Sequence, residues 1–183
     1  MKREFFINIL FLIGINVLIK PVYIFGIDRT VQNTVGPEAY GIFFALFNFT
    51  FLFQIINDFG IQNYNNRLIA QHRHLVPRYL PQVLSLKLVL AVVYLGTIFL
   101  ASRVAGYGAQ YDHLILLVGF NQILVGLLFY LRTNISGLGL YRRDSIVSAL
   151  DKFLMILLCG TLLWTPSFRE QFKIEWFIMA QSV

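Results

Sequence analysis

The chain has 183 residues, of which 57% are hydrophobic and only 13% are charged. Soluble domains carry about 25% charged residues, so this composition excludes a water-soluble globular fold. The net charge of +6 does not indicate a nucleic-acid partner, because the basic residues lie between apolar runs rather than in one cluster. A charge placed in hydrocarbon is costly, and the sequence therefore predicts an integral protein of the lipid bilayer.

Apolar runs long enough to cross a membrane follow one another along the chain. A membrane-spanning helix needs about 20 mostly apolar residues, and the runs that meet this length are 5–31, 39–64, 83–103, 113–135 and 146–165. A sixth apolar stretch, 174–183, is about half a span long. The sequence thus predicts an all-α, polytopic transmembrane helix bundle with five complete spans and the start of a sixth. Because a helix does not end in hydrocarbon with unpaired carbonyls, we expect residues 1–183 to be a single transmembrane domain and the N-terminal fragment of a longer protein.

The short connections between these runs indicate the orientation of the chain. Lys2 and Arg3 precede the first run, and the connections 65–82 and 136–145 each contain arginines. The connections that lack Lys and Arg are 32–38 and 104–112. The positive-inside rule therefore predicts that the N-terminus and the basic connections lie in the cytoplasm. We also expect a short interfacial helix within 65–82, which mixes apolar and basic residues.

The first run contains charged residues within an apolar sequence. Lys20 lies about 22 Å along a helix that begins near residue 5, at 1.5 Å per residue, and Pro21, which follows it, predicts a kink. A lysine at a broken helix is a candidate anion site near the membrane centre, but Lys20 is equally compatible with snorkelling to the outer interface. Asp28 and Arg29 end the same helix, where Arg29 lines either a cavity mouth or the outer headgroup region.

The second run is interrupted by the polar sequence Asn-Asp-Phe-Gly at 57–60. A carboxylate facing lipid is costly, so Asp58 should face protein or water. Its expected partner is Lys20 or Arg67. A structural ion pair and a substrate-coupled or proton-coupled carboxylate are both compatible with this position.

Later runs contain small and polar residues whose expected role is packing between helices. Gly119 and Gly126 share one helix face and predict a close helix contact. The polar residues expected to form interhelical hydrogen bonds include Asn121, Gln122 and Asn134.

Motifs for catalysis are missing from the sequence. It contains no nucleophile elbow, phosphate-binding loop or paired-carboxylate motif, and His72 and His74 have no third metal ligand nearby. A single cysteine, Cys159, excludes an intrachain disulfide and is expected to be a small packing residue. We therefore expect no enzyme activity, no cofactor and no metal site.

Several short motifs resemble the N-terminal region of the bacterial polysaccharide flippases, the Wzx-like O-antigen and exopolysaccharide exporters, which are related to the MATE drug exporters and the lipid II flippases. The shared pattern is a turn of the form G-x-x-x-Y-G, an apolar helix, the sequence D-F-G and an arginine near the inner end. In this chain the corresponding residues are 35–41 (VGPEAYG), 57–61 (NDFGI), 67–70 (RLIA) and 137–144 (GLGLYRRD).

The resemblance implies a function as well as a fold. Such flippases have two pseudo-symmetric lobes around a central cavity and move undecaprenyl-diphosphate-linked glycans across the bacterial inner membrane by alternating access. This chain would supply the N-terminal half of that two-lobe transporter fold. The cavity residues implied are Lys20, Arg29 and Arg67, which would meet the diphosphate, and Asp58, which would hold one of those cations or bind a coupling ion, H⁺ or Na⁺.

Three alternatives stay open on the sequence alone. The first is a cation-coupled multidrug exporter of the same superfamily, although such exporters favour acidic cavities and the charges of the first run are mixed. The second is a membrane-embedded enzyme, whose catalytic motifs would have to lie outside these residues. The third is a non-transporting membrane subunit or remnant.

Overall fold

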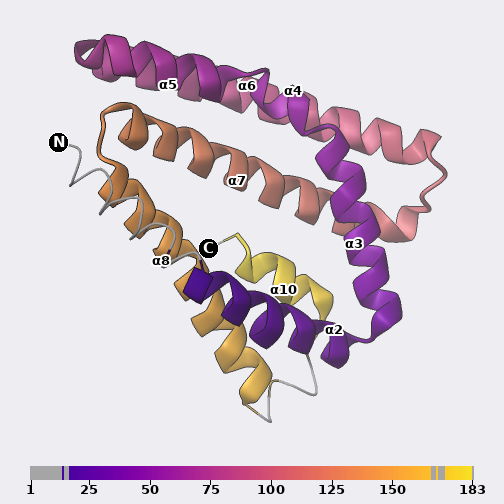
Figure 1. The fold of residues 1–183 in the computed structure, drawn as a ribbon. Coiled ribbons are helices and arrows are strands. Elements are labelled where there is room, and N and C mark those ends of the chain that lie inside the picture. The colour runs from indigo at the N-terminus through magenta and orange to yellow at the C-terminus, as the bar shows by residue number, and fades with distance from the viewer. Residues whose placement is uncertain (1–13, 15–16, 166–167, 169–171, 183) are drawn as a thin grey trace. The chain divides into compact units, whose positions relative to one another are not determined.

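The structure is a computed structural model that describes residues 14, 17–165, 168 and 172–182, and these residues form helices and no strands (Figure 1). The all-α prediction is therefore confirmed for the described residues. They divide into two compact units: unit 1 contains the residues up to Gly41 and those from Leu140 to Gln181, and unit 2 contains Ile42–Gly139 with Ser182. The predicted start of the first span, with Lys2 and Arg3, lies outside the described residues.

The first helix of unit 1 changes its register directly after Pro21. Residues 17–21 are α-helical, Val22–Asp28 form the π-helix η1, and Arg29–Val35 form α2. A proline has no backbone N–H to donate, so the regular hydrogen-bond pattern is interrupted at that point. The irregularity expected beside Lys20 is thus a π-helical segment, a form found mostly as short insertions within α-helices.

A tight turn follows α2. Gly36 has φ 87° and ψ 158°, a conformation that is essentially restricted to glycine. Pro37 begins α3 (Pro37–Leu52), where its missing N–H leaves no helical hydrogen bond unmade. The helical segments Val17–Val35 and Pro37–Leu52 are bent by 118° at this break. Gly36 and Pro37 therefore make the turn of the motif 35–41 a sharp bend.

We expect Gly36→Ala to lower the free energy of unfolding by about 1–3 kcal/mol, because a Cβ is strained in this backbone conformation. The space around Gly36 is open, with nothing within 4 Å of an added Cβ, so the effect would come from the backbone alone. Gly41→Ala is the matched control, since that glycine is helical and its surroundings are equally open. Denaturation of the purified variants in detergent measures both, and equal stabilities would contradict the assignment.

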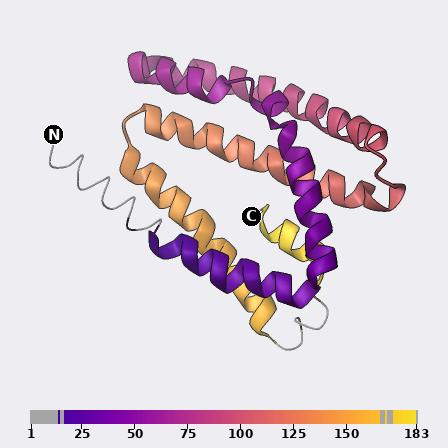
Figure 2. The same ribbon diagram turned by 45° about the vertical axis from the view of Figure 1, so that its right-hand side comes forward.

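Two further helices among the described residues of unit 1 pack against this first segment. They are α8 (Tyr141–Trp164) and α10 (Ile174–Ala180); α8 contacts η1, and α10 contacts both α8 and α2 (Figure 2). Fully buried side chains in this unit include Ile27, Val31, Cys159, Leu163, Phe177 and Ile178. The thiol of Cys159 lies 3.9 Å from the sulfur of Met155. Cys159 is therefore a small core residue, as the sequence predicts.

Unit 2 is built around α7. Its elements are the rest of α3, α4 (Gln54–Asp58), α5 (Ile61–Gln71), η2 (Arg73–Leu75), α6 (Val76–Val104), η3 (Ala109–Tyr111) and α7 (Asp112–Gly137). Helix α7 contacts α4, α5 and α6, and α4 also contacts α6. Leu46, Tyr94, Ile98 and Ile115 form the buried core of this unit.

Glycines on one face of α7 allow the neighbouring helices to approach closely. A Cβ at Gly119 would lie 2.3 Å from Cδ1 of Ile98 on α6, and one at Gly126 would lie 2.6 Å from Nδ2 of Asn57 on α4. A Cβ at Gly137 would meet Ile69 of α5 at 3.0 Å. The close packing predicted from Gly119 and Gly126 is therefore confirmed, and Gly137 extends it.

The run expected over 39–64 is divided in the structure. Helix α3 ends at Leu52, a break at Phe53 precedes α4, and a second break at Phe59 and Gly60 precedes α5. The expected connection 65–82 also differs, because α5 continues to Gln71 and α6 already begins at Val76. The basic residues of this connection are therefore mostly helical.

Among the described residues, three helices are long and apolar enough to cross a membrane: Val76–Val104, Ala109–Gly137 and Tyr141–Trp164. The bent pair Val17–Val35 and Pro37–Leu52 raises this number to four if it forms one span. Helix α6 leaves Leu88, Val89 and Val92 exposed, as is typical of a helix that faces lipid. The chain is thus a multi-pass membrane protein, and the number of five complete spans stays a prediction.

Candidate functional site

The break after Asp58 creates a polar site inside unit 2. Phe59 and Gly60 both adopt the left-handed conformation, with φ of 45° and 77°, which a residue with a side chain rarely takes. The N–H of Phe59 still donates to the carbonyl of Ile55 at 2.8 Å, so α4 ends in a closed turn. The chain then leaves the axis of α4, and the carbonyl of Asn57 becomes available to a side chain from another helix.

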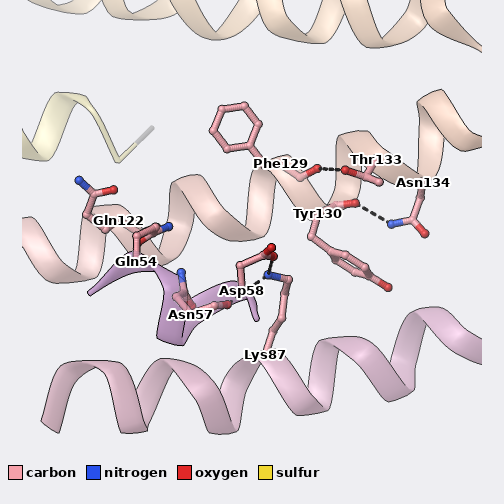
Figure 3. Close-up of polar contacts among 9 residues, drawn as sticks. All are labelled: Gln54, Asn57, Asp58, Lys87, Gln122, Phe129, Tyr130, Thr133 and Asn134. Carbon is pink, nitrogen blue, oxygen red and sulfur yellow. Dashed lines mark hydrogen bonds and ion pairs between the residues drawn. The ribbon is translucent and has the colours of Figure 1, made fainter. Parts of the chain in front are cut away.

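That side chain is Lys87 of α6. Its ammonium donates to Oδ1 of Asp58 at 3.1 Å and to the carbonyl oxygen of Asn57 at 3.3 Å (Figure 3). Its Nζ also lies 5.7 Å from the centroid of the Tyr130 ring on α7, within the range of a cation–π contact. Three helices, α4, α6 and α7, therefore surround a single ammonium group.

The exposure of the two charges differs. The side chain of Lys87 is 4% exposed, and that of Asp58 is 23% exposed. A buried ammonium is strongly unfavourable unless it is paired and hydrogen-bonded, so Lys87 depends on the carboxylate and the carbonyl. Of the two side chains in the pair, that of Asp58 is the more accessible from outside the unit.

Amide side chains extend the polar site along α4 and α7. The Nε2 group of Gln54 donates to the carbonyl of Gln122 at 3.4 Å. Further atoms of these amides are buried and lack a hydrogen-bond partner among the described residues: Oε1 of Gln54, Nδ2 of Asn57 and Nε2 of Gln122. Buried polar atoms are normally paired with protein or ordered water, so unpaired amides mark a site for water or ligand.

A small cavity adjoins the ion pair. It has a volume of about 30 Å³ and is lined by Asn57, Lys87, Leu88, Ala91, Ile123 and Leu127. A cavity needs at least about 10–15 Å³ to hold one water molecule. The site therefore has room for water beside the Lys87 stem, but not for a large ligand in this conformation.

A second polar contact joins α5 to α7. Nδ2 of Asn65 donates to Oδ1 of Asn134 at 3.2 Å, and Nδ2 of Asn134 donates to the carbonyl of Tyr130 at 2.7 Å. Both asparagines are buried. The interhelical role predicted for Asn134 is thus confirmed, and its partner Asn65 is an addition from the structure.

The four predicted cavity residues are divided between the units. Lys20 and Arg29 belong to unit 1 and are exposed, whereas Asp58 and Arg67 belong to unit 2, where Arg67 is also exposed. The expected partner of Asp58 was Lys20 or Arg67, but the structure pairs Asp58 with Lys87. The physical reason is the break after α4, which turns the end of that helix toward α6.

Asp28, the last residue of η1, also has a defined partner. The prediction that Asp28 and Arg29 end the first helix is wrong, because the helix continues through α2 to Val35. The hydroxyl of Tyr40 donates to Oδ1 of Asp28 at 2.8 Å. Tyr40 is the tyrosine of the G-x-x-x-Y-G turn, so this hydrogen bond spans the Gly36 bend within unit 1. It ties the end of the π-helix to the first turn of α3.

Lys87 is the central residue that sequence reasoning missed. It lies four residues inside the predicted span 83–103, close enough to its start to be taken for a flanking charge. The signal was present, however, because an ionisable residue within a membrane span is a functional candidate by default. Its partner was not predictable from spacing, because 29 residues separate it from Asp58.

Comparison with known proteins identifies the family of the chain. The family model described as "Polysaccharide biosynthesis protein" matches residues 5–167, which is most of the sequence. Comparisons with curated proteins and with solved structures gave no match. The members of this family are flippase-type transporters, so the resemblance seen in the turn and D-F-G motifs is confirmed. The chain therefore belongs to the polysaccharide biosynthesis protein family of flippases.

Proposed function

We propose that this protein moves a lipid-linked oligosaccharide, carried on undecaprenyl diphosphate, across the bacterial inner membrane by alternating access. The family supports a role in polysaccharide transport. The observation that carries the proposal is the polar site at the break of α4, where Lys87, Asp58 and buried amides lie within an otherwise apolar helical unit. Ionisable residues held within a membrane protein are costly and mark transport pathways.

The diphosphate of the carrier lipid explains why cations are needed. A doubly charged headgroup crosses hydrocarbon only if protein cations and water replace its hydration. Lys20, Arg29 and Arg67 are exposed on their units and are our proposed ligands for it. Asp58 would regulate the charge of the site through its pairing with Lys87.

The chain would form part of a larger transporter and would have a defined orientation in the membrane. The two units described here would form part of the first lobe, and a second lobe would complete the cavity around the glycan. The positive-inside rule supports a cytoplasmic N-terminus. A coupling ion, H⁺ or Na⁺, would drive the exchange between the inward-open and outward-open states.

Neutralising each proposed ligand tests the function directly. In bacteria whose own exporter is deleted, we expect Lys20→Gln, Arg29→Gln and Arg67→Gln each to reduce glycan export about tenfold or more, because a hydrogen bond to a charged group contributes about 1.5–3 kcal/mol. Export is measured as surface polysaccharide per cell, with protein levels in the membrane determined in parallel. Arg78→Gln is the matched control, since Arg78 is also exposed but lies in the first turn of α6, before the predicted span 83–103 begins.

The same experiment separates the competing function. Export at the wild-type level in all three variants would remove the proposed role of these cations. Drug resistance conferred by the gene, without restored polysaccharide, would instead favour the multidrug exporter.

A further inference from the structure

Two hydrogen-bond acceptors and one aromatic ring lie around the ammonium of Lys87. They are the carbonyl of Asn57 at 3.3 Å, the carboxylate of Asp58 at 3.1 Å and the face of the Tyr130 ring at 5.7 Å (Figure 3). The carbonyl lies at the C-terminal end of α4, where the aligned peptide dipoles leave partial negative charge. A carbonyl released at a helix break, together with a carboxylate, is a set of ligands suited to a small cation.

We propose that the break of α4 is a binding site for a monovalent cation that the chain fills with its own ammonium group, Lys87. As long as Lys87 occupies the site, Asp58 does not bind a free ion. The α4 break would bind this ammonium group whatever molecule the protein transports.

The ammonium of Lys87 is attached to the chain, and this attachment explains why a free cation does not displace it from the site. A group attached to the chain has an effective concentration set by its tether, and it enters the site without losing translational freedom. Lys87 is also held by the packing of α6 against α4 and α7. Removing the side chain should therefore open the site to a cation from solution.

Space for such a cation is available in the structure. Truncating Lys87 at Cβ would join the volume of its stem to the existing cavity of about 30 Å³, which the same side chain lines. An apolar wall would surround the alkyl part of a bound organic cation, formed by Leu88 and Ala91 of α6 and Ile123 of α7. Ethylammonium matches this shape, with an ammonium end for the oxygens and a short apolar end for the wall.

The test is a cation titration of the full chain purified in a nonionic detergent. We expect the unfolding temperature of Lys87→Ala to rise with ethylammonium chloride, by a few degrees for each roughly tenfold increase above the dissociation constant. Sodium chloride tests whether an inorganic ion is also accepted, and choline chloride at equal ionic strength is the reference that is too large for the site. The wild type, Lys87→Arg and the control Lys152→Ala should show no difference between ethylammonium and choline.

A second variant shows whether the site is the one described. Lys87→Ala combined with Asp58→Asn removes the carboxylate ligand and should abolish the specific response. The proposal is overturned if Lys87→Ala responds equally to ethylammonium, sodium and choline, or if the double variant keeps the response. If Lys87→Ala is not recovered in choline buffer, recovery of folded protein in ethylammonium buffer supports the proposal, and equally poor recovery in both overturns it.

Discussion

Replacing Asp58 with alanine is expected to lower the free energy of unfolding by about 3 kcal/mol, because removing one partner of a buried pair leaves the other charge uncompensated. Lys87 is 4% exposed and, among the residues that the structure describes, would keep the carbonyl of Asn57 at 3.3 Å as its one hydrogen-bond acceptor. Titration with a denaturing detergent, followed by tryptophan fluorescence or circular dichroism, measures the change.

Two controls separate this effect from a general loss of charge. The double variant Asp58→Ala with Lys87→Met should recover most of the stability, since replacing a whole buried pair with apolar residues is often neutral. Arg103→Ala breaks the pair with Asp112 beside the connection 104–112, where the two side chains are 42% and 26% exposed, and should change stability by less than about 1 kcal/mol. If Asp58→Ala has no larger effect than Arg103→Ala, the Lys87 pair is not a buried structural element.

The apolar runs contained enough information to predict much of the fold. A helix that crosses lipid must satisfy all its backbone groups internally, so about 20 apolar residues specify a helix with little competition. The expected runs 83–103, 113–135 and 146–165 correspond to α6, α7 and α8. The glycines of α7 were also informative, because a missing side chain on a helix face marks close packing wherever the partner comes from.

The candidate site was only partly predictable. Asp58 stood out because a carboxylate in an apolar run needs an explanation. The helix break beside Asp58 was not predictable from the sequence. Phe59 has a left-handed backbone at φ 45°, a conformation that its side chain disfavours. Helix α4 packs against α6 and α7, and α5 packs against α7, and within this arrangement Asp58 pairs with Lys87 rather than with the arginine on α5.

A leucine at Gly126 is expected to reduce the free energy of unfolding by about 3 kcal/mol, at the upper end of the range for overpacking a filled contact. A Cβ there would lie 2.6 Å from Nδ2 of Asn57 and 3.3 Å from Nε2 of Gln54, so a leucine side chain has no space between α7 and α4. Displacing α4 would also move the Asn57 carbonyl away from Lys87. The change is measured by the same detergent denaturation.

Gly96→Leu is the matched control for this substitution. Gly96 is also helical, but it is exposed, and nothing lies within 4 Å of an added Cβ. Leucine is a better helix former than glycine by somewhat less than about 1 kcal/mol, so Gly96→Leu should be neutral or slightly stabilising. Equal effects at the two positions would show that α4 does not approach α7 closely at Gly126. A loss at Gly126 alone would show that α4 packs against α7 at this position only because α7 has no side chain there.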